Sequence, residues 1–269
     1  MESVRSADRD RYLSVLYAPQ DKRAALFALY AFNVEIAAVR DRIREPLPGE
    51  IRLQWWRDAI ANDEAQGHPL AEALLEAIRR YRLPRKTFED YLEARVFDLY
   101  DDPMPDRNAL EGYCGETASA LIQLAALVLD PQAAARGADA AGHAGCTQAI
   151  TGLLRLLPQH RARGQCFVPK DILAAAGTTP EEFVAGDGGP GAERAVAAMI
   201  ALAREHLGAF QHGVRELPHS LRPAFLSAAL SGAYLDRMEG PGSSPLRTVA
   251  TLSEWRRHWL LFKDARRGW

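Results

Sequence analysis

Side chains able to carry chemistry are sparse in this sequence, and residues 30–41, YAFNVEIAAVRD, show this best. At helical spacing, one face of this segment carries Tyr30, Val34, Ala37 and Asp41. A row of carboxylates at such positions can hold Mg²⁺ against a phosphate group, because Mg²⁺ prefers oxygen ligands. Here two small apolar residues, Ala37 and Ala38, precede the single acid Asp41. One carboxylate is too few for such a site.

A second segment, residues 141–170, contains no Asp or Glu. Its basic side chains are those of Arg155, Arg161, Arg163 and Lys170. Basic side chains repel Mg²⁺ and attract phosphate, so we expect no metal here and consider direct phosphate binding by Arg155 and its neighbours. Pro158, within LLRLLPQH, should interrupt the helical register because it lacks a backbone N–H.

The other acids and imidazoles give weaker signals. A DxxDD cluster just before Pro103 contains Asp98, Asp101 and Asp102. This cluster is typical of an acidic helix end at the surface, with a partner contact and a relocated metal site as the alternatives. His143 and His160 have no partner at metal-ligand spacing, so we expect them to be solvated or hydrogen-bonded.

The composition is that of a globular protein with a large core, at 269 residues, 48% hydrophobic and 25% charged. A formal net charge of −2 gives no electrostatic reason to expect a nucleic-acid partner. The three cysteines lack ligand spacing, so we expect free packing residues in a reducing compartment. The N-terminus lacks the apolar region of a secretory signal, and the longest apolar run, residues 120–129, is about half of a membrane span. These features predict a cytoplasmic protein.

Strong helix formers and helical apolar spacing dominate the chain, and no strand pattern is evident. We therefore expect an all-α fold in which residues 1–269 form a single domain. The expected helices cover residues 6–17, 20–43, 49–62, 69–80, 85–100, 107–129, 133–157, 193–215, 220–238 and 249–264. The prolines of residues 46–49 should separate two helices, and residues 177–191 should form a loop.

Several segments resemble the squalene/phytoene synthase superfamily, whose active members are head-to-head prenyl transferases. The first motif helix of that family is similar to LFALYAFNVEIAAVRD, and its central segment to LEARVFDLYDDPMPDRNALEGYCGETASALI. The second motif is similar to CTQAITGLLRLLPQHRARGQCFVP, and a late helix that closes the pocket to AALSGAYLDRMEG. The resemblance implies an all-α isoprenoid-synthase fold around a central cavity.

The metal-binding carboxylates that the resemblance implies are missing from the sequence. Active members carry Asp-Asp-x-x-Asp on the first motif helix, where this chain has Ala37, Ala38 and Asp41. They carry Asp-x-x-x-Asp on a facing helix, where this chain has Leu156 and His160. Without Mg²⁺ to neutralise the diphosphates, catalysis should slow by on the order of three to six decades. We therefore expect no catalytic residues and no metal.

Degenerate motifs and a Gln-Trp-Trp element at residues 54–56 bring the chain closest to a non-catalytic branch of the superfamily. That branch includes a mitochondrial assembly factor of respiratory complex I and bacterial relatives. The resemblance therefore implies an assembly role, a membrane respiratory complex subunit or intermediate as the partner, and no cofactor. Two alternatives stay open. One is an active prenyl transferase with altered ligands and magnesium; the other is a carrier of isoprenoids or lipids.

The resemblance also implies a hydrophobic cavity between the helices. Its candidate ligand-binding residues are Tyr30, Val34, Cys146, Gln148, Arg155 and Tyr234. Further candidates for the lining, each better explained as core, are Phe32, Leu121, Leu124, Ile150 and Leu153. With alanines at 37 and 38 and leucines at 156 and 157, we expect an apolar mouth, either collapsed or open to a neutral isoprenoid tail.

Residues 254–269, the C-terminal segment of the same domain, combine aromatic and basic side chains. They include Trp255, Arg256, Arg257, Trp259 and Trp269. Five Lys or Arg and two acidic residues between 252 and 269 give a net charge of +3. This pattern is typical of a final helix docked on the protein body with a basic outer face, and the alternative is a peripheral position on the inner face of the membrane. Trp55 and Trp56 are adjacent, so one should be core and the other a partner-surface candidate.

Overall fold

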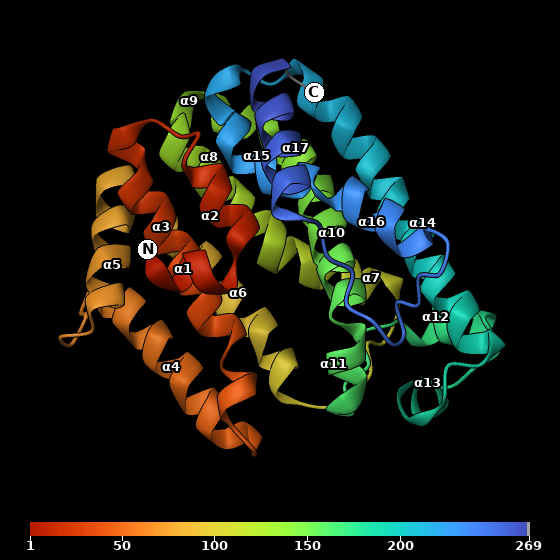
Figure 1. Cartoon of the computed structure of the whole chain (residues 1–269). Helices are drawn as coiled ribbons and strands as arrows, with labels where there is room; N and C mark the ends of the chain where they lie inside the picture. Colours follow the sequence, from red (N-terminus) through yellow and green to blue (C-terminus); the bar gives the residue numbers. More distant parts are fainter. Residues whose placement is uncertain (268–269) are drawn as a thin grey trace.

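The computed structural model describes residues 1–267, and in that part of the chain every regular element is a helix (Figure 1). The all-α prediction is confirmed. The α-helices are α1 (Glu2–Ala7), α2 (Arg9–Val15), α3 (Gln20–Ala37), α4 (Pro46–Asn62), α5 (Pro69–Tyr81), α6 (Arg85–Ala94), α7 (Arg107–Cys114), α8 (Ala120–Leu129), α9 (Pro131–Ala134), α10 (Ala138–Arg155), α11 (Leu157–Ala162), α12 (Lys170–Ala175), α13 (Pro180–Ala185), α14 (Pro190–Gly213), α15 (Arg222–Ala229), α16 (Ser231–Glu239) and α17 (Glu254–Arg267). A π-helix, Gly115–Ser119, joins α7 to α8. Short 3₁₀ helices cover Arg40–Arg42, Arg95–Leu99, Ala135–Gly137, Val214–Glu216 and His219–Leu221.

The helix expected at residues 20–43 ends earlier, at Ala37. Beyond it the chain tightens into the 3₁₀ helix Arg40–Arg42, and Asp41 is exposed there. The expectation that Asp41 shares one helical face with Tyr30 was therefore wrong. Arg40 and Arg42 hold this turn against other elements, because their guanidinium groups pair with Asp101 and Glu35.

Proline marks two further boundaries. The helix expected at residues 49–62 starts three residues earlier, because Pro46 stands in the first turn, where its missing N–H costs nothing. Pro158 acts as predicted: α10 ends at Arg155, and a separate helix, α11, carries the proline in its first turn. The loop expected at residues 177–191 instead contains α13, which Thr179 and Glu182 start with a reciprocal capping box.

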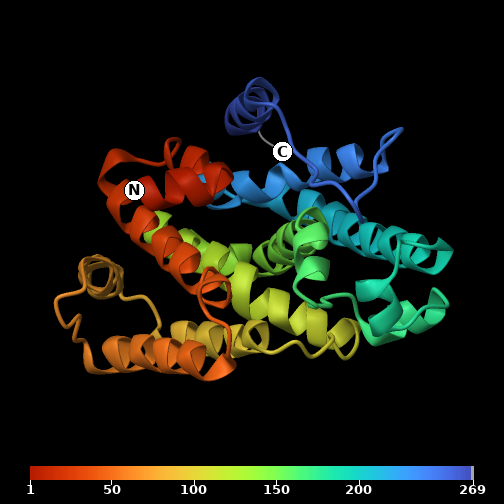
Figure 2. The same ribbon diagram turned by 60° about the horizontal axis from the view of Figure 1, so that its bottom comes forward.

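Helix α10 forms the centre of the molecule and packs against α14, α8, α15 and α16. On the other side of the core, α3 packs against α5 and α8. Figure 2 shows α17 lying over α15 at the edge of the molecule, and it also contacts α2. One continuous stretch, Arg107–Leu129, is apolar and long enough to span a membrane, but 72% of its most apolar window is buried, which is the pattern of a core helix.

One close approach sets the position of α10. A side chain at Gly145 would meet the backbone nitrogen of Ser119 at 2.3 Å, so the π-helix and α10 approach too closely for any residue but glycine. The hydroxyl of Ser119 donates a 3.0 Å hydrogen bond to the carbonyl of Gly142 one turn earlier. This contact keeps the following turns of α10, from Gln148 to Arg155, along the wall of the central cavity.

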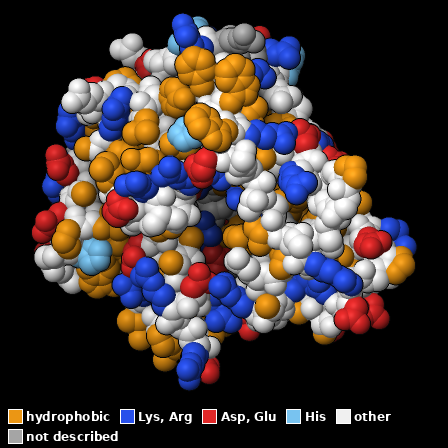
Figure 3. All heavy atoms as spheres, in the orientation of Figure 1, with side chains coloured by type: hydrophobic (Ala, Val, Ile, Leu, Met, Phe, Trp, Pro, Cys, Tyr) orange, Lys and Arg blue, Asp and Glu red, His pale blue; other side chains and the backbone are white. Residues whose placement is uncertain are grey.

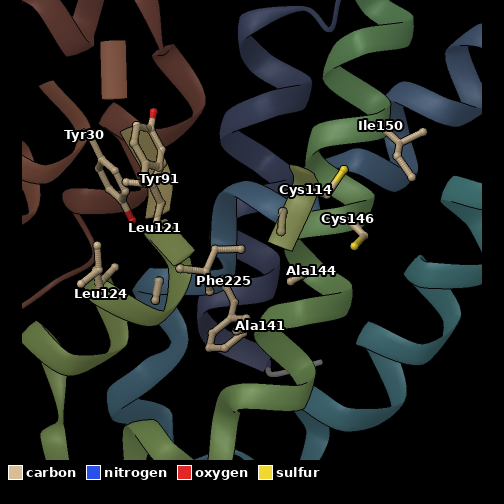
Figure 4. Packing of buried hydrophobic residues seen from close by; sticks show 14 of the residues in the cluster. Tyr30, Tyr91, Cys114, Leu121, Leu124, Ala141, Ala144, Cys146, Ile150 and Phe225 are labelled. Carbon is tan, nitrogen blue, oxygen red and sulfur yellow. The ribbon is translucent and has the colours of Figure 1, made fainter. Parts of the chain in front are cut away.

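The buried core accounts for several residues that were candidates for the cavity lining. Figure 4 shows Tyr30, Leu121, Leu124, Cys146 and Ile150 packed among other buried side chains. Phe32, also buried, contacts the rings of Trp56, Phe88 and Tyr91. All three cysteines are free and buried, as predicted for packing residues.

Candidate functional site

A cavity of about 420 Å³ opens between the N-terminal segment, the end of α3, the π-helix, α10, α11 and α16. Figure 3 shows a hollow in the middle of the face seen in Figure 1, with charged side chains of both signs around it. Most of the lining side chains are polar or charged, which contradicts the expected apolar cavity. The charged ones are Asp8, Asp10, Arg11, Arg40, Asp41, Arg95, Asp98, Arg155 and Arg163.

Pairs of oppositely charged side chains bridge the mouth of the cavity, so the mouth is not apolar on both walls. Arg163, which follows α11, donates a hydrogen bond from Nη1 to the carboxylate of Asp41, which follows α3. Next to this pair, Arg40 contacts Asp101 at 3.0 Å. The alanines at 37 and 38 and the leucine at 156 therefore coexist with an ion pair, Asp41–Arg163, that connects the two walls.

A network around Arg95 forms the floor of the cavity. Nη1 of Arg95 lies 2.9 Å from Asp98 and 2.8 Å from the hydroxyl of Tyr113, which itself donates to Asp98 at 2.8 Å. Nη2 of Arg95 reaches Asn33, which also accepts a 2.8 Å hydrogen bond from Tyr91. Asp98 thus belongs to the interior, whereas Asp101 of the same DxxDD cluster is exposed. The expectation of an acidic surface end is wrong for Asp98.

The N-terminal segment brings two carboxylates into the cavity. Asp8 caps α2 and pairs with Arg11 at 2.6 Å, and Arg11 donates a second hydrogen bond to Gln148 at 2.8 Å. Arg11 also lies over the ring of Tyr30, 5.6 Å from its centroid. Burial raises the pKa of Tyr30 to about 12, so its phenol stays neutral.

The second carboxylate, Asp10, is surrounded by donors. It accepts a hydrogen bond from the hydroxyl of Tyr234 at 2.8 Å and pairs with Nε of Arg257 at 2.7 Å. Arg155 stacks on the ring of Tyr234 with its guanidinium carbon 3.7 Å from the centroid. Burial raises the pKa of Asp10 above its ordinary value, against the opposing effect of Tyr234 and Arg257.

His160 lies in the cavity wall, and its side chain is half-buried. Its ring lies 4.8 Å from that of Phe167, and its Nδ1 is buried without a hydrogen-bond partner among the described residues. Burial lowers the pKa of His160 to about 4, so the imidazole is neutral at physiological pH. His143, in contrast, contacts His206 with its Nδ1 at 3.0 Å, a partner that lies 63 residues away in sequence.

The predicted site residues divide between cavity, core and surface. The cavity is lined by Ala37, Asp41, Gln148, Arg155, Leu156, His160 and Tyr234, together with Leu153. Tyr30 and Cys146 are buried in the core, and neither they nor Val34 and Ala38 are lining residues. Arg161 turns away from the cavity and donates to the carbonyls of Phe183, Leu246 and Gly186, so it clamps loops and does not belong to a phosphate site.

The tryptophan and arginine candidates separate in the same way. Trp56 is fully buried, and Trp55 is half-buried with its Nε1 donating to Gln66. Trp255 and Trp259 are 88% and 61% exposed on α17, and Arg256 is exposed beside them. Arg257 is buried and paired with Asp10, so it cannot belong to a membrane or partner surface. Trp269 lies outside the described residues.

The side chains present do not fit a magnesium ion. Among residues 1–267, no three or more His, Cys, Asp or Glu side chains are grouped so that they could hold a metal. The carboxylates that do line the cavity each contact an arginine, namely Arg11, Arg257, Arg163 or Arg95. A carboxylate already neutralised by a guanidinium is a poor ligand for a second cation.

Sequence reasoning missed the N-terminal part of the site. The only signal was the alternation of acids and bases in residues 8–11, directly ahead of an apolar run, and such charges are ordinarily solvated. It also missed Asn33, Arg95 and Tyr113, which the chain brings together from three separate elements. No spacing rule predicts such a network.

This arrangement of helices around a cavity defines the fold of the helical isoprenoid synthases. A dehydrosqualene synthase in complex with a ligand matches with a TM-score of 0.83, covering 97% of this chain and 92% of that chain at 17% identity. The squalene synthase HpnC from Alicyclobacillus acidocaldarius matches with a TM-score of 0.71, covering 88% and 90% at 19% identity. At these identities the likeness concerns the fold alone.

The chain belongs to the squalene/phytoene synthase family, whose model matches residues 4–262. Its relatives include "NADH dehydrogenase (ubiquinone) complex I, assembly factor 6" of Bos taurus, 31% identical over 242 residues, which are 89% of this chain and 72% of that protein. The Homo sapiens counterpart is 28% identical with the same coverage. A presqualene diphosphate synthase of Zymomonas mobilis is 27% identical and covers 86% of this chain and 80% of that protein. Assembly factors and synthases thus both occur among its relatives.

Proposed function

We propose that this chain is a non-catalytic member of the family that assists the assembly of respiratory complex I. Its similarity to complex I assembly factor 6 proteins, at 31% identity to the Bos taurus protein, supports the assembly role. The structural observation that carries the proposal is the Asp41–Arg163 pair. Asp41 is the one carboxylate among the five motif positions, and the chain's own cation neutralises it.

The electrostatics of the cavity support the absence of prenyl transfer. A diphosphate brings several negative charges into a partly buried space, which is prohibitive without cations. Magnesium would supply them in an active synthase, but the carboxylates here are engaged by arginines. The polar lining likewise gives little support to storage of a neutral isoprenoid tail, because polar groups without water or a partner are costly.

The assembly role is tested by deleting the gene in its host and measuring assembled NADH:quinone oxidoreductase on native gels. We expect loss of the assembled complex and its recovery on expression of the wild-type chain. An Asp41→Asn variant should restore assembly equally well, because the Asp41–Arg163 pair is half-exposed and contributes little to stability. Normal assembly in the deletion strain would contradict the assembly role.

The non-catalytic part has its own test. Purified protein is incubated with farnesyl or geranylgeranyl diphosphate and Mg²⁺, and released diphosphate is measured. We expect no release above the rate without protein. Turnover at the rate of a squalene or phytoene synthase assayed in parallel would show that other ligands replace the motif and would refute this part of the proposal.

We further propose a peripheral position on the inner face of the membrane, through the outer face of α17. Trp255, Trp259 and Phe262 follow one another at helical spacing and are all exposed, with Arg256 and Lys263 beside them. Aromatic rings next to cationic side chains favour the interface of anionic bilayers. The opposite face of α17 docks on the body through buried Arg257 and Leu261.

Vesicle co-sedimentation tests this position. We expect binding to vesicles of phosphatidylglycerol and phosphatidylcholine, and its loss in a Trp255→Ser/Trp259→Ser variant. Leu47 and Ile51 of α4 are exposed to a similar degree, at 64% and 62%, so a Leu47→Ser/Ile51→Ser variant is the matched control and should bind normally. Equal binding by all three proteins would exclude α17 as the contact.

A further inference from the structure

Side chains from three other helices converge on the carboxylate of Asp10. The hydroxyl of Tyr234, on α16, donates to it at 2.8 Å, and Arg257, on α17, contacts it at 2.7 Å. Arg155, at the end of α10, lies 3.9 Å from the same carboxylate. Asp10 itself belongs to α2, near the start of the chain. The side chains of Asp10 and Arg257 are only 14% and 10% exposed.

The three donors are held in place independently of Asp10. Arg155 stacks on Tyr234 and donates from Nε to the carbonyl of Ala250 at 3.1 Å. Arg257 is additionally fixed by Glu254 at 2.6 Å and reaches the hydroxyl of Tyr234 at 3.3 Å. Two guanidinium groups and a phenol thus surround one point, which is the arrangement of an anion site. Only the phenol donates a hydrogen bond to Asp10, because Nε of Arg257 and Oδ1 of Asp10 are close but have no hydrogen-bond partner among the described residues.

The chain itself supplies the anion in this site. The 3.9 Å contact of Arg155 to Asp10 exceeds a hydrogen bond, so Arg155 keeps donors for a further acceptor in the cavity that it lines. A phosphate entering beside Asp10 would bring a second negative charge into a partly buried space, where like charges repel strongly.

We infer that Arg155, Arg257 and Tyr234 form an anion-binding site, and that Asp10 occupies it and excludes phosphate and diphosphate groups while α2 is in place. The N-terminal segment thus acts as an internal occupant of the cavity. Burial raises the pKa of Asp10, against the lowering effects of Tyr234, Arg257 and Arg155. This inference concerns binding alone and is independent of the assembly role.

Calorimetric titration with inorganic diphosphate, without Mg²⁺, tests it. We expect no saturable binding to the wild-type chain at millimolar diphosphate, and binding to Asp10→Ala that is tighter by at least about tenfold. Adding Arg257→Ala to Asp10→Ala should abolish the gained binding, because a guanidinium of the site is then lost. Asp63→Ala is the matched control. Asp63 is a carboxylate outside the cavity that also pairs with two arginines. The Asp63→Ala chain should therefore show no saturable diphosphate binding, like the wild type.

Two outcomes overturn the inference. One is wild-type binding as tight as that of Asp10→Ala; the other is a folded Asp10→Ala chain, shown by circular dichroism, that gives no binding. Should the alanine variant not fold, Asp10→Asn keeps the volume and an acceptor for Tyr234, and the same result is expected from it. Thermal melting of the wild-type chain needs no variant. A diphosphate-dependent rise in its melting temperature would refute the occupied site.

Discussion

Replacing Asp98 by alanine should be among the most costly single changes in the cavity wall. The substitution removes the acceptor 2.9 Å from Nη1 of Arg95 and the acceptor of the Tyr113 hydroxyl. The side chains of Arg95 and Asp98 are only 16% and 14% exposed, so the arginine would keep a buried charge with no ionic partner. Removing one partner of a buried pair costs roughly 3–5 kcal/mol. Because Arg95 keeps its contacts to Tyr113 and Asn33, we expect a loss of about 3 kcal/mol in the free energy of unfolding.

Urea denaturation at pH 7, followed by tryptophan fluorescence and circular dichroism, measures this loss. Asp101→Ala is the matched control, because Asp101 belongs to the same acidic cluster and also pairs with an arginine, but its side chain is 54% exposed. An exposed pair contributes about 0–1 kcal/mol, so the control should unfold almost like the wild type. Equal losses for Asp98→Ala and Asp101→Ala would refute the assignment of Asp98 to the interior.

Three further predictions concern packing, protonation and loop order. Gly145→Ala should destabilise the chain by roughly 1–3 kcal/mol, because the new methyl group would strike the backbone of Ser119. Gly142→Ala, which has open space around the new methyl group, should be neutral or stabilising, and thermal melting of the two variants compares them. His160 has its pKa lowered to about 4, so the unfolded chain binds a proton that the folded chain does not between about pH 6.5 and pH 4. Stability should therefore fall as the pH drops through that range by up to about 3 kcal/mol, and His160→Gln should flatten the dependence; an unchanged slope in this variant would contradict the assignment. Arg161→Ala should speed hydrogen exchange around residues 183–186 and 246, because three carbonyls lose their donor, while Arg163→Ala should leave that exchange unchanged.

Helical periodicity and proline positions were enough to predict the all-α fold and most helices, because both act locally. The errors fall where tertiary contacts prevail over local pattern. The helix expected to reach residue 43 stops at Ala37, and the turn beyond it is held by Arg40, whose partner Asp101 lies 61 residues away in the chain. The short helix α13 was missed because it is hidden in a glycine-rich stretch, although its Thr179–Glu182 capping box is a local signal.

The site was less predictable than the fold. Motif positions and Tyr234 were placed at the cavity by resemblance to a family, and the structure brings most of them together there. The charge pairing was not predictable, because the partners of each pair are far apart in sequence: Asp41 with Arg163, and Asp10 with Arg257. Hydrophobicity alone suggested an apolar mouth, since it cannot show that arginines and carboxylates from distant segments meet there.

Under the proposed non-catalytic role, these ion pairs take the place that metal ions hold in a metal-dependent synthase. In a metal-dependent synthase, carboxylates at the mouth need cations from solution, and these cations in turn attract the diphosphate. Here fixed arginines neutralise the carboxylates, so the wall is stable without a metal. Restoring carboxylates at positions 37, 38, 156 and 160 would therefore be insufficient to recruit magnesium. Arg163 and the Asp10 cluster would also have to be released, because they already satisfy the charges that a metal and its diphosphate would otherwise balance.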